Sequence, residues 1–215
     1  MSQHTLTLLR FTYKKLKEKL TVSDSKKLFH EQFPYVIPGL YKRMVDEMLV
    51  ELNLLDHQNE FTQDYLFSIG LTETFKELMK GYKPEEHLDL LFESLCISTN
   101  FVPKEIKQLS QKSQKEFKDK PLKDILELLK EKSNSKLYPS IILNLGTYIV
   151  ISNAQDFKEK NESEVNKIIS EIFENLTLSS SKAEKDIGIY KSTISKMEQA
   201  KELIEELRVK EKKKG

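Results

Sequence analysis

The sequence predicts an all-α protein: a single multi-helix, bundle-like domain followed by a long, coiled-coil-like C-terminal helix. Three observations support this. Glycine and proline are scarce, with six of each in 215 residues, and nearly all fall at the ends of segments with helical periodicity. Within those segments, apolar residues recur at three- and four-residue spacing. Residues 141–151 are apolar on nearly all sides, and because no segment reads as a partner strand, they are predicted to form a central buried helix.

The first helices begin at recognisable capping signals. Thr21, with Asp24 three residues on, is a near capping box that opens a short helix ending at about Gln32. Pro34 and Pro38 predict an extended corner, and Pro38 suits the first turn of the next helix because its missing N–H is not needed there. That helix has one apolar face, formed by Leu40, Met44, Val45, Met48, Leu49 and Leu52.

The following helices repeat these signals. Asp64 opens one, and Gly81 is a left-handed stop for it. Pro84, Pro103 and Pro121 lead three more, with proline at the first helical position. The predicted inward-facing residues are Phe67, Leu71, Phe75, Leu78 and Met79; Leu88, Leu91, Phe92, Leu95 and Cys96; Ile106 and Leu109; and Leu122, Ile125, Leu126 and Leu129. After the buried helix, one more apolar stripe consists of Val165, Ile168, Ile169, Ile172, Phe173 and Leu176.

From Ser180 to about Lys210 the pattern changes to a single long helix. A heptad seam recurs at alternating four- and three-residue spacing: Ala183, Ile187, Tyr190, Ile194, Met197, Lys201 and Ile204. The helix would be roughly 45 Å long at ~1.5 Å per residue. Two interpretations stay open, a protruding antiparallel or intermolecular coiled coil and simple packing along the body.

The predicted domain organisation has three parts. Residues 1–20 form a basic N-terminal extension, residues 21–178 the helical domain, and residues 179–215 the long charged helix with a basic tail. The extension lacks the continuous apolar core and the small-residue cleavage site of a secretory signal. It is interpreted as a disordered extension, with an amphipathic arm or a weak organelle-targeting peptide as alternatives. No run reaches the ~18–20 apolar residues of a membrane span. Lys and Arg number 35 against 34 Asp and Glu, so no global field predicts nucleic-acid binding.

No motif in the chain carries recognisable chemistry. The four histidines, His4, His30, His57 and His87, have no partner at metal-ligand spacing. The single cysteine, Cys96, sits in an apolar helical pattern and is interpreted as a buried hydrophobe rather than a reactive thiol. No nucleophile elbow, phosphate-binding glycine loop or dinucleotide fingerprint is present. We therefore expect a non-enzymatic interaction protein with no catalytic residues, cofactor or metal.

Several segments resemble the thylakoid formation protein family of cyanobacteria and plastids, also described as photosystem II-associated. They are Thr21-Val-Ser-Asp-Ser-Lys-Lys-Leu-Phe29, Pro38-Gly-Leu-Tyr41 leading into Asp46-Glu-Met-Leu-Val-Glu51, Phe67-Ser-Ile-Gly-Leu-Thr-Glu-Thr-Phe75 and Leu78-Met-Lys-Gly-Tyr82. Residues 138–151 and the charged C-terminal helix are also similar, so the resemblance runs from Thr21 to the end. The basic extension departs from the short cyanobacterial form and from a serine-rich plastid transit peptide.

The resemblance implies a function and partners that the residues alone do not. It implies a role in thylakoid membrane biogenesis and photosystem II assembly or repair, by binding or stabilising the FtsH protease complex, with photosystem II-related membrane proteins as further partners. It places the protein peripherally on the cytoplasmic face of the thylakoid membrane of a cyanobacterial cell, or in the plastid stroma of a eukaryote. It carries over no site residues, because the family has no catalytic motif.

Two sets of contact residues are predicted from the sequence itself. The basic tail would attract anionic lipid headgroups or a partner through Arg208, Lys210, Lys212, Lys213 and Lys214, at about 1 kcal/mol for each cation near the surface, and a solvated tail is the alternative. The coiled-coil seam would pair two chains through Ile187, Tyr190, Ile194, Met197 and Ile204, giving a homodimeric scaffold.

Overall fold

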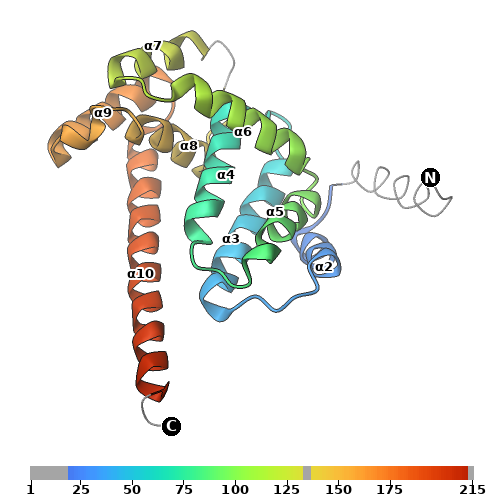
Figure 1. Cartoon of the computed structure of the whole chain (residues 1–215). Helices are drawn as coiled ribbons and strands as arrows, with labels where there is room; N and C mark the ends of the chain where they lie inside the picture. The colour runs from blue at the N-terminus through green and yellow to red at the C-terminus, as the bar shows by residue number, and fades with distance from the viewer. Residues whose placement is uncertain (1–18, 133–136, 213–215) are drawn as a thin grey trace. The chain divides into compact units, whose positions relative to one another are not determined.

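The computed structural model describes residues 19–132 and 137–212, and all regular secondary structure in these residues is helical (Figure 1). The predicted all-α class is therefore confirmed. The α-helices are α2 (Val22–Gln32), α3 (Gly39–Asp56), α4 (Tyr65–Leu78), α5 (Leu88–Ile97), α6 (Pro103–Phe117), α7 (Leu122–Lys132), α8 (Ile141–Ser152), α9 (Glu162–Asn175) and α10 (Ser180–Lys212). Short 3₁₀ helices span Glu85–His87 and Phe157–Glu159.

The helices fall into two compact units. The first contains α2, α3 and α5, and the second contains α4 and α6 to α10. This division does not follow the boundaries drawn from the sequence at residues 21, 178 and 179, which stay a prediction.

The first unit is held together at the start of α2. The side chain of Thr21 accepts a hydrogen bond from the Asp24 N–H, and the Asp24 carboxylate accepts one from the Thr21 N–H, so the capping box is complete. From α3, the buried Asn53 amide donates to the Leu20 carbonyl at 2.6 Å and to the Ser25 hydroxyl at 2.8 Å. These bonds fix the start of α2 on α3 and satisfy a buried amide that would otherwise be costly.

Three prolines differ slightly in position from the prediction: besides Pro38 and Pro84, Pro121 stands one residue before α7, which begins at Leu122. Pro38 has extended backbone angles and precedes α3, which begins at Gly39. Pro84 leads the 3₁₀ turn Glu85–His87, which then runs into α5. In each case proline lies just outside the α-helix, a shift of one residue or one turn that sequence signals do not resolve.

In the second unit, α4 and α8 cross at close range. α8 is the buried helix predicted from the sequence: eight of its residues are buried, and Ser140 caps it by accepting a hydrogen bond from the Leu143 N–H. Around this pair lies an apolar core that includes Ile69, Ile125, Leu143, Ile151 and Phe173. Gly81 ends the α4 segment with a φ of 77°, as the sequence predicted.

The first half of α10 packs on α8 and α9 (Figure 1). Ala183 and Ile187 are buried and belong to the core of this unit, and Tyr190 packs against it. The buried Asp186 accepts a 2.8 Å hydrogen bond from the Asn144 amide of α8. Packing along the body therefore accounts for this half of the predicted seam, while the coiled coil is not confirmed.

Candidate functional site on the last turns of α10

The last turns of α10 expose large apolar side chains. Leu203 is 58% exposed, Leu207 52%, Val209 42% and Ile204 40%. Elsewhere on this helix, Ala183, Ile187 and Met197 are almost fully buried. A cluster of solvent-exposed leucine and isoleucine on one helix is a common mark of a contact surface for another protein or for a membrane.

The helical register places three of these residues on one face. At about 100° per residue, Leu203, Leu207 and Ile204, together with Ala200, share one side of the helix, which we call the α10 apolar face. Val209 lies on the other side. Because three of the residues are separated by three or four positions, they form a continuous stripe over two turns.

Charge is sorted around the α10 apolar face. Around the helix, Lys210 lies next to Leu203 at one edge of this face, and Lys201 lies next to Ile204 at the other edge. The carboxylates on the opposite side belong to Glu202, Glu205 and Glu206. Lys210 lies 3.9 Å from Glu206, an exposed pair that is worth little and leaves the lysine available to a partner. An apolar stripe with cations at its edges and acids behind it suits a partner surface that is apolar and negatively charged.

The structure describes only part of the predicted basic-tail contact. Lys210 is exposed near the α10 apolar face. Arg208 and Lys212 lie within the helical range of α10, but their side chains lie outside the described residues, as do Lys213 and Lys214 entirely. The basic-tail contact therefore stays a prediction.

The predicted seam residues separate into two groups. Ile187 and Met197 are buried and Tyr190 and Ile194 are half-buried, whereas Ile204 is exposed. Burial raises the pKa of Tyr190 well above its usual range, and the nearby carboxylates of Glu77 and Glu73 add to the rise. Sequence reasoning missed Leu203 and Leu207, because the heptad register was drawn through Lys201 and Ile204. Their i, i+4 spacing was the signal that could have found them.

The cysteine and the described histidines each have their own local surroundings. Cys96 is fully buried, as predicted. The His87 ring stacks on the Tyr35 ring, with 3.8 Å between the ring centroids. His57 Nδ1 lies 2.8 Å from the Asn53 carbonyl oxygen. His4 lies outside the described residues. Within those residues, no group of three or more His, Cys, Asp or Glu side chains could hold a metal ion. A search of the same residues finds no helix both long and apolar enough to cross a membrane.

These observations describe a helical protein with an exposed apolar face near the end of α10. Comparison with known proteins identifies its family. A family model described as "Thylakoid formation protein" matches residues 21–215, and the chain belongs to that family.

Relatives cover almost the whole chain. The chain is 80% identical over 199 residues to Protein Thf1 of Prochlorococcus marinus (strain MIT 9312), and this match covers 93% of this chain and 99% of that protein. It is 38% identical over 200 residues to Protein Thf1 of Synechococcus sp. (strain CC9605), covering 90% and 91%. A solved structure of Psb29 aligns with a TM-score of 0.80 and 27% identity, covering 91% of this chain and 98% of that one. The resemblance stated from the sequence is thus confirmed.

Proposed function

We propose that this protein is a non-enzymatic, peripheral factor in thylakoid membrane biogenesis and photosystem II assembly or repair. It acts on the cytoplasmic face of the thylakoid membrane by binding or stabilising the FtsH protease complex. The family supports the thylakoid role. The α10 apolar face supports the mode of action, because exposed leucines flanked by lysines favour docking to a membrane-associated partner.

The α10 apolar face is the observation that carries this proposal. Leu203 and Leu207 are each more than half exposed, so replacing them removes little buried area and leaves the fold intact. The same replacements remove the apolar contact that a docked partner would bury, at roughly 1.5–3 kcal/mol for each fully buried leucine. Their expected effect is therefore on binding and not on stability.

A pull-down from detergent-solubilised cyanobacterial thylakoids tests the proposal. The full chain is expected to retain the FtsH complex, and Leu203→Gln with Leu207→Gln is expected to lose at least nine-tenths of it, since ~1.4 kcal/mol is tenfold. Val209→Gln is the matched control for Leu207→Gln, because it changes an exposed apolar residue nearby on the opposite side of the helix. If Leu207→Gln and Val209→Gln, each made alone, retain equal amounts of FtsH, the α10 apolar face has no part in the mechanism. If no bait retains FtsH, the protease partner is excluded.

The same face also favours a second function, peripheral membrane binding without a protease partner. The chain would then pellet with anionic vesicles, and removing residues 208–215 would weaken pelleting while leaving the helices before residue 208 intact. Because cation–headgroup attraction is screened, pelleting would also fall as salt rises. Pelleting that is unaffected by both changes would exclude the basic tail as the contact.

A further inference from the structure

A small pocket lies in the first unit, between α2, α3 and the segment that joins these two helices (Figure 1). Its walls come from the end of α2, from residues 35–37 of the joining segment and from the first half of α3. Its volume is about 240 Å³, below the roughly 300–1,000 Å³ of small-molecule sites, and suits one side chain of a partner protein. Nothing in the proposed function uses this pocket.

The joining segment supplies the accessible apolar surface of the pocket. Phe29 and Val45 also line it, but each is only 2% exposed and offers little to a ligand. Val36, in contrast, is 91% exposed and is the most exposed large apolar side chain in the described part of the chain, and Tyr35 is 46% exposed. A side chain inserted beside Val36 would therefore bury apolar area that is open to water in the free protein.

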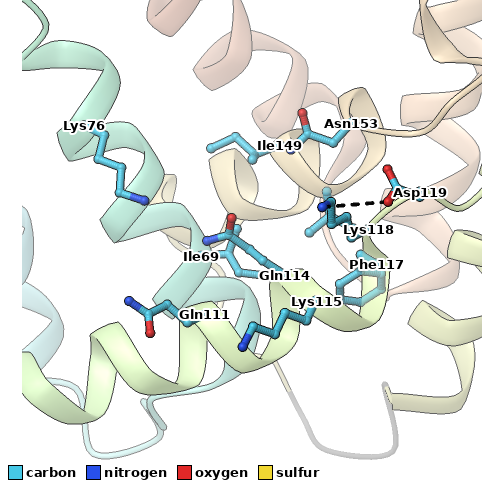
Figure 2. Close-up of a pocket in the computed structure, with 11 residues that line it drawn as sticks. Ile69, Lys76, Gln111, Gln114, Lys115, Phe117, Lys118, Asp119, Ile149 and Asn153 are labelled. Carbon is cyan, nitrogen blue, oxygen red and sulfur yellow. Dashed lines mark ion pairs between the residues drawn. The ribbon is translucent and has the colours of Figure 1, made fainter.

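The larger hollow of the second unit, about 580 Å³ in volume, differs in this respect (Figure 2). Ile69, Phe117 and Val150 line it, but all three are at least 96% buried, and most of the other lining residues are lysine, glutamine or asparagine. Of these two hollows, the pocket of the first unit is therefore the one that offers exposed apolar surface.

Aromatic contacts hold the joining segment in place. The ring of Tyr35 stacks on the ring of His87, with 3.8 Å between ring centroids, and meets the buried Phe33 ring edge-on at 5.4 Å. Phe33 and Ile37 each precede a proline, which favours extended backbone at both positions. Because this wall is ordered before a partner binds, little conformational freedom is lost on binding.

The backbone of the joining segment has unpaired hydrogen-bonding groups. Within the described residues, no hydrogen bond joins the N–H or carbonyl groups of Val36 and Ile37 to another residue. An extended peptide can pair with such groups while alternate side chains point toward the pocket. A helix cannot, because its own N–H and carbonyl groups are already paired along most of its length. The backbone therefore favours an extended occupant.

The rim of the pocket carries a positive charge without a counter-ion. Asp46 lies 3.7 Å from Lys26 of α2, and each side chain is a little under half exposed, so this carboxylate already has a cation beside it. Lys42, one turn earlier on α3, is exposed and forms no ion pair within the described residues. A carboxylate next to the inserted side chain would supply the missing charge. Residues 1–20 of this chain are basic and therefore a poor occupant.

We propose that this pocket binds an extended segment of a partner protein in which an apolar side chain lies beside an acidic one. The apolar side chain enters the pocket next to Val36, and the carboxylate lies near Lys42. A polar segment would leave Val36 uncovered, and a basic segment would place like charges together at Lys42. The proposal is independent of the α10 apolar face, so either contact can fail without the other.

Two-dimensional amide NMR spectra of the isotope-labelled full chain test both halves of this segment. The probes are blocked peptides of sequence Gly-Asp-Xaa-Asp-Gly, where Xaa is Leu, Ile, Val or Phe, with an acid on each side so that either chain direction can bind. One control peptide has alanine as Xaa, and a second set has asparagine in place of both aspartates.

At least one probe is expected to shift the amide signals of Val36, Ile37 and Lys42 in a saturable way. It should bind about tenfold more tightly than the alanine peptide, and up to about fivefold more tightly than its asparagine counterpart. Equal binding of the alanine peptide, equal binding of the asparagine peptide, or no shift at these residues with any of the four probes would each overturn the proposal.

Single substitutions locate the site. With the tightest probe, Val36→Gln is expected to weaken binding about tenfold and Lys42→Gln up to about fivefold. Val102→Gln and Lys27→Gln are the matched controls, because each changes an exposed residue of the same type, in the same unit, that does not line the pocket. All four side chains are exposed, so the variants should unfold at the wild-type temperature. Equal loss in a variant and its control would overturn the assignment to this pocket.

A second copy of this chain is the alternative occupant, and sedimentation velocity distinguishes it from a partner protein. The sedimentation coefficients of the wild type and of Val36→Gln are expected to be equal at every concentration measured. A coefficient that rises with concentration in the wild type, and not in Val36→Gln, would assign the pocket to a second copy and overturn the proposal.

Discussion

Gly70 of α4 and Gly146 of α8 face each other where the two helices cross. A Cβ on Gly70 would lie 2.0 Å from the Ile142 carbonyl oxygen, and a Cβ on Gly146 would lie 1.9 Å from the Leu66 carbonyl oxygen. Both distances are far inside van der Waals contact. The obstructing atoms are backbone oxygens, which cannot rotate away as a side chain can. The crossing therefore requires a residue without a side chain on each helix.

The first prediction concerns this crossing. Gly146→Ala should lower the free energy of unfolding by about 3 kcal/mol or more, at the upper end for overpacked cores, and lower the melting temperature by roughly 10 °C. Gly188→Ala is the control, because a Cβ there meets nothing within 4 Å and alanine is the better helix former by about 1 kcal/mol. Thermal unfolding followed by circular dichroism measures both. A melting temperature unchanged in Gly146→Ala would contradict the close approach.

The second prediction concerns the bond that joins α8 to α10. Asn144 and Asp186 are 2% and 8% exposed, so removing the amide leaves a buried carboxylate without this donor. Asn144→Leu should cost about 3 kcal/mol. Asp186→Leu in the same chain should recover part of that loss, because the carboxylate is then gone. Urea unfolding of the two single variants and the double variant measures the coupling, and strictly additive losses would show that the bond contributes nothing.

The third prediction concerns pH and Asp64, the cap of α4. Burial raises the pKa of Asp64 to about 6 from its ordinary 3.8, and hydrogen bonds from the Phe67 and Leu66 N–H groups oppose the rise only partly. Between pH 4 and pH 6 the folded chain holds this proton and the unfolded chain has lost it. The contribution of Asp64 to the free energy of unfolding therefore falls as pH rises, by up to about 3 kcal/mol, and is constant above pH 6.

An asparagine at position 64 isolates this effect. Asp64→Asn keeps an oxygen to accept the Phe67 N–H bond of 2.8 Å but cannot ionise. The variant should match the wild type near pH 4 and exceed it at pH 7, when urea unfolding is measured across this range. Asp124→Asn, which removes an exposed carboxylate in the first turn of α7, controls for the change in net charge. A difference that is flat with pH would show that Asp64 does not titrate in this window.

The fourth prediction concerns oligomeric state. The protein should sediment as a monomer at tens of micromolar, because the α10 apolar face spans only two turns and stable interfaces bury roughly 1,200–2,000 Å². Sedimentation velocity at several concentrations measures this. A sedimentation coefficient that rises with concentration in the wild type, and not in Leu203→Gln with Leu207→Gln, would instead favour the homodimeric scaffold.

The sequence by itself determined the helices and most of their ends. Thr21, Asp64 and Gly81 act through contacts within a few residues, and such local signals can be recognised without knowing the fold. It also indicated that residues 141–151 form a largely buried helix, since a helix apolar on nearly all sides has little face to offer water, although Ile141 at its start is 42% exposed. The family was recognisable for the same reason, because its marker segments lie around these local signals.

Only the tertiary structure decided which apolar residues of α10 are covered. Ile187 and Leu203 are equally apolar in sequence, yet Ile187 packs into the core with α8 and α9 while Leu203 lies beyond them, exposed. The same holds for Lys76 and Lys118, which are far apart in the chain and line one surface hollow only because α4, α6 and α8 pack together. Periodicity fixes the face on which a side chain lies, but what covers that face depends on contacts between residues distant in sequence.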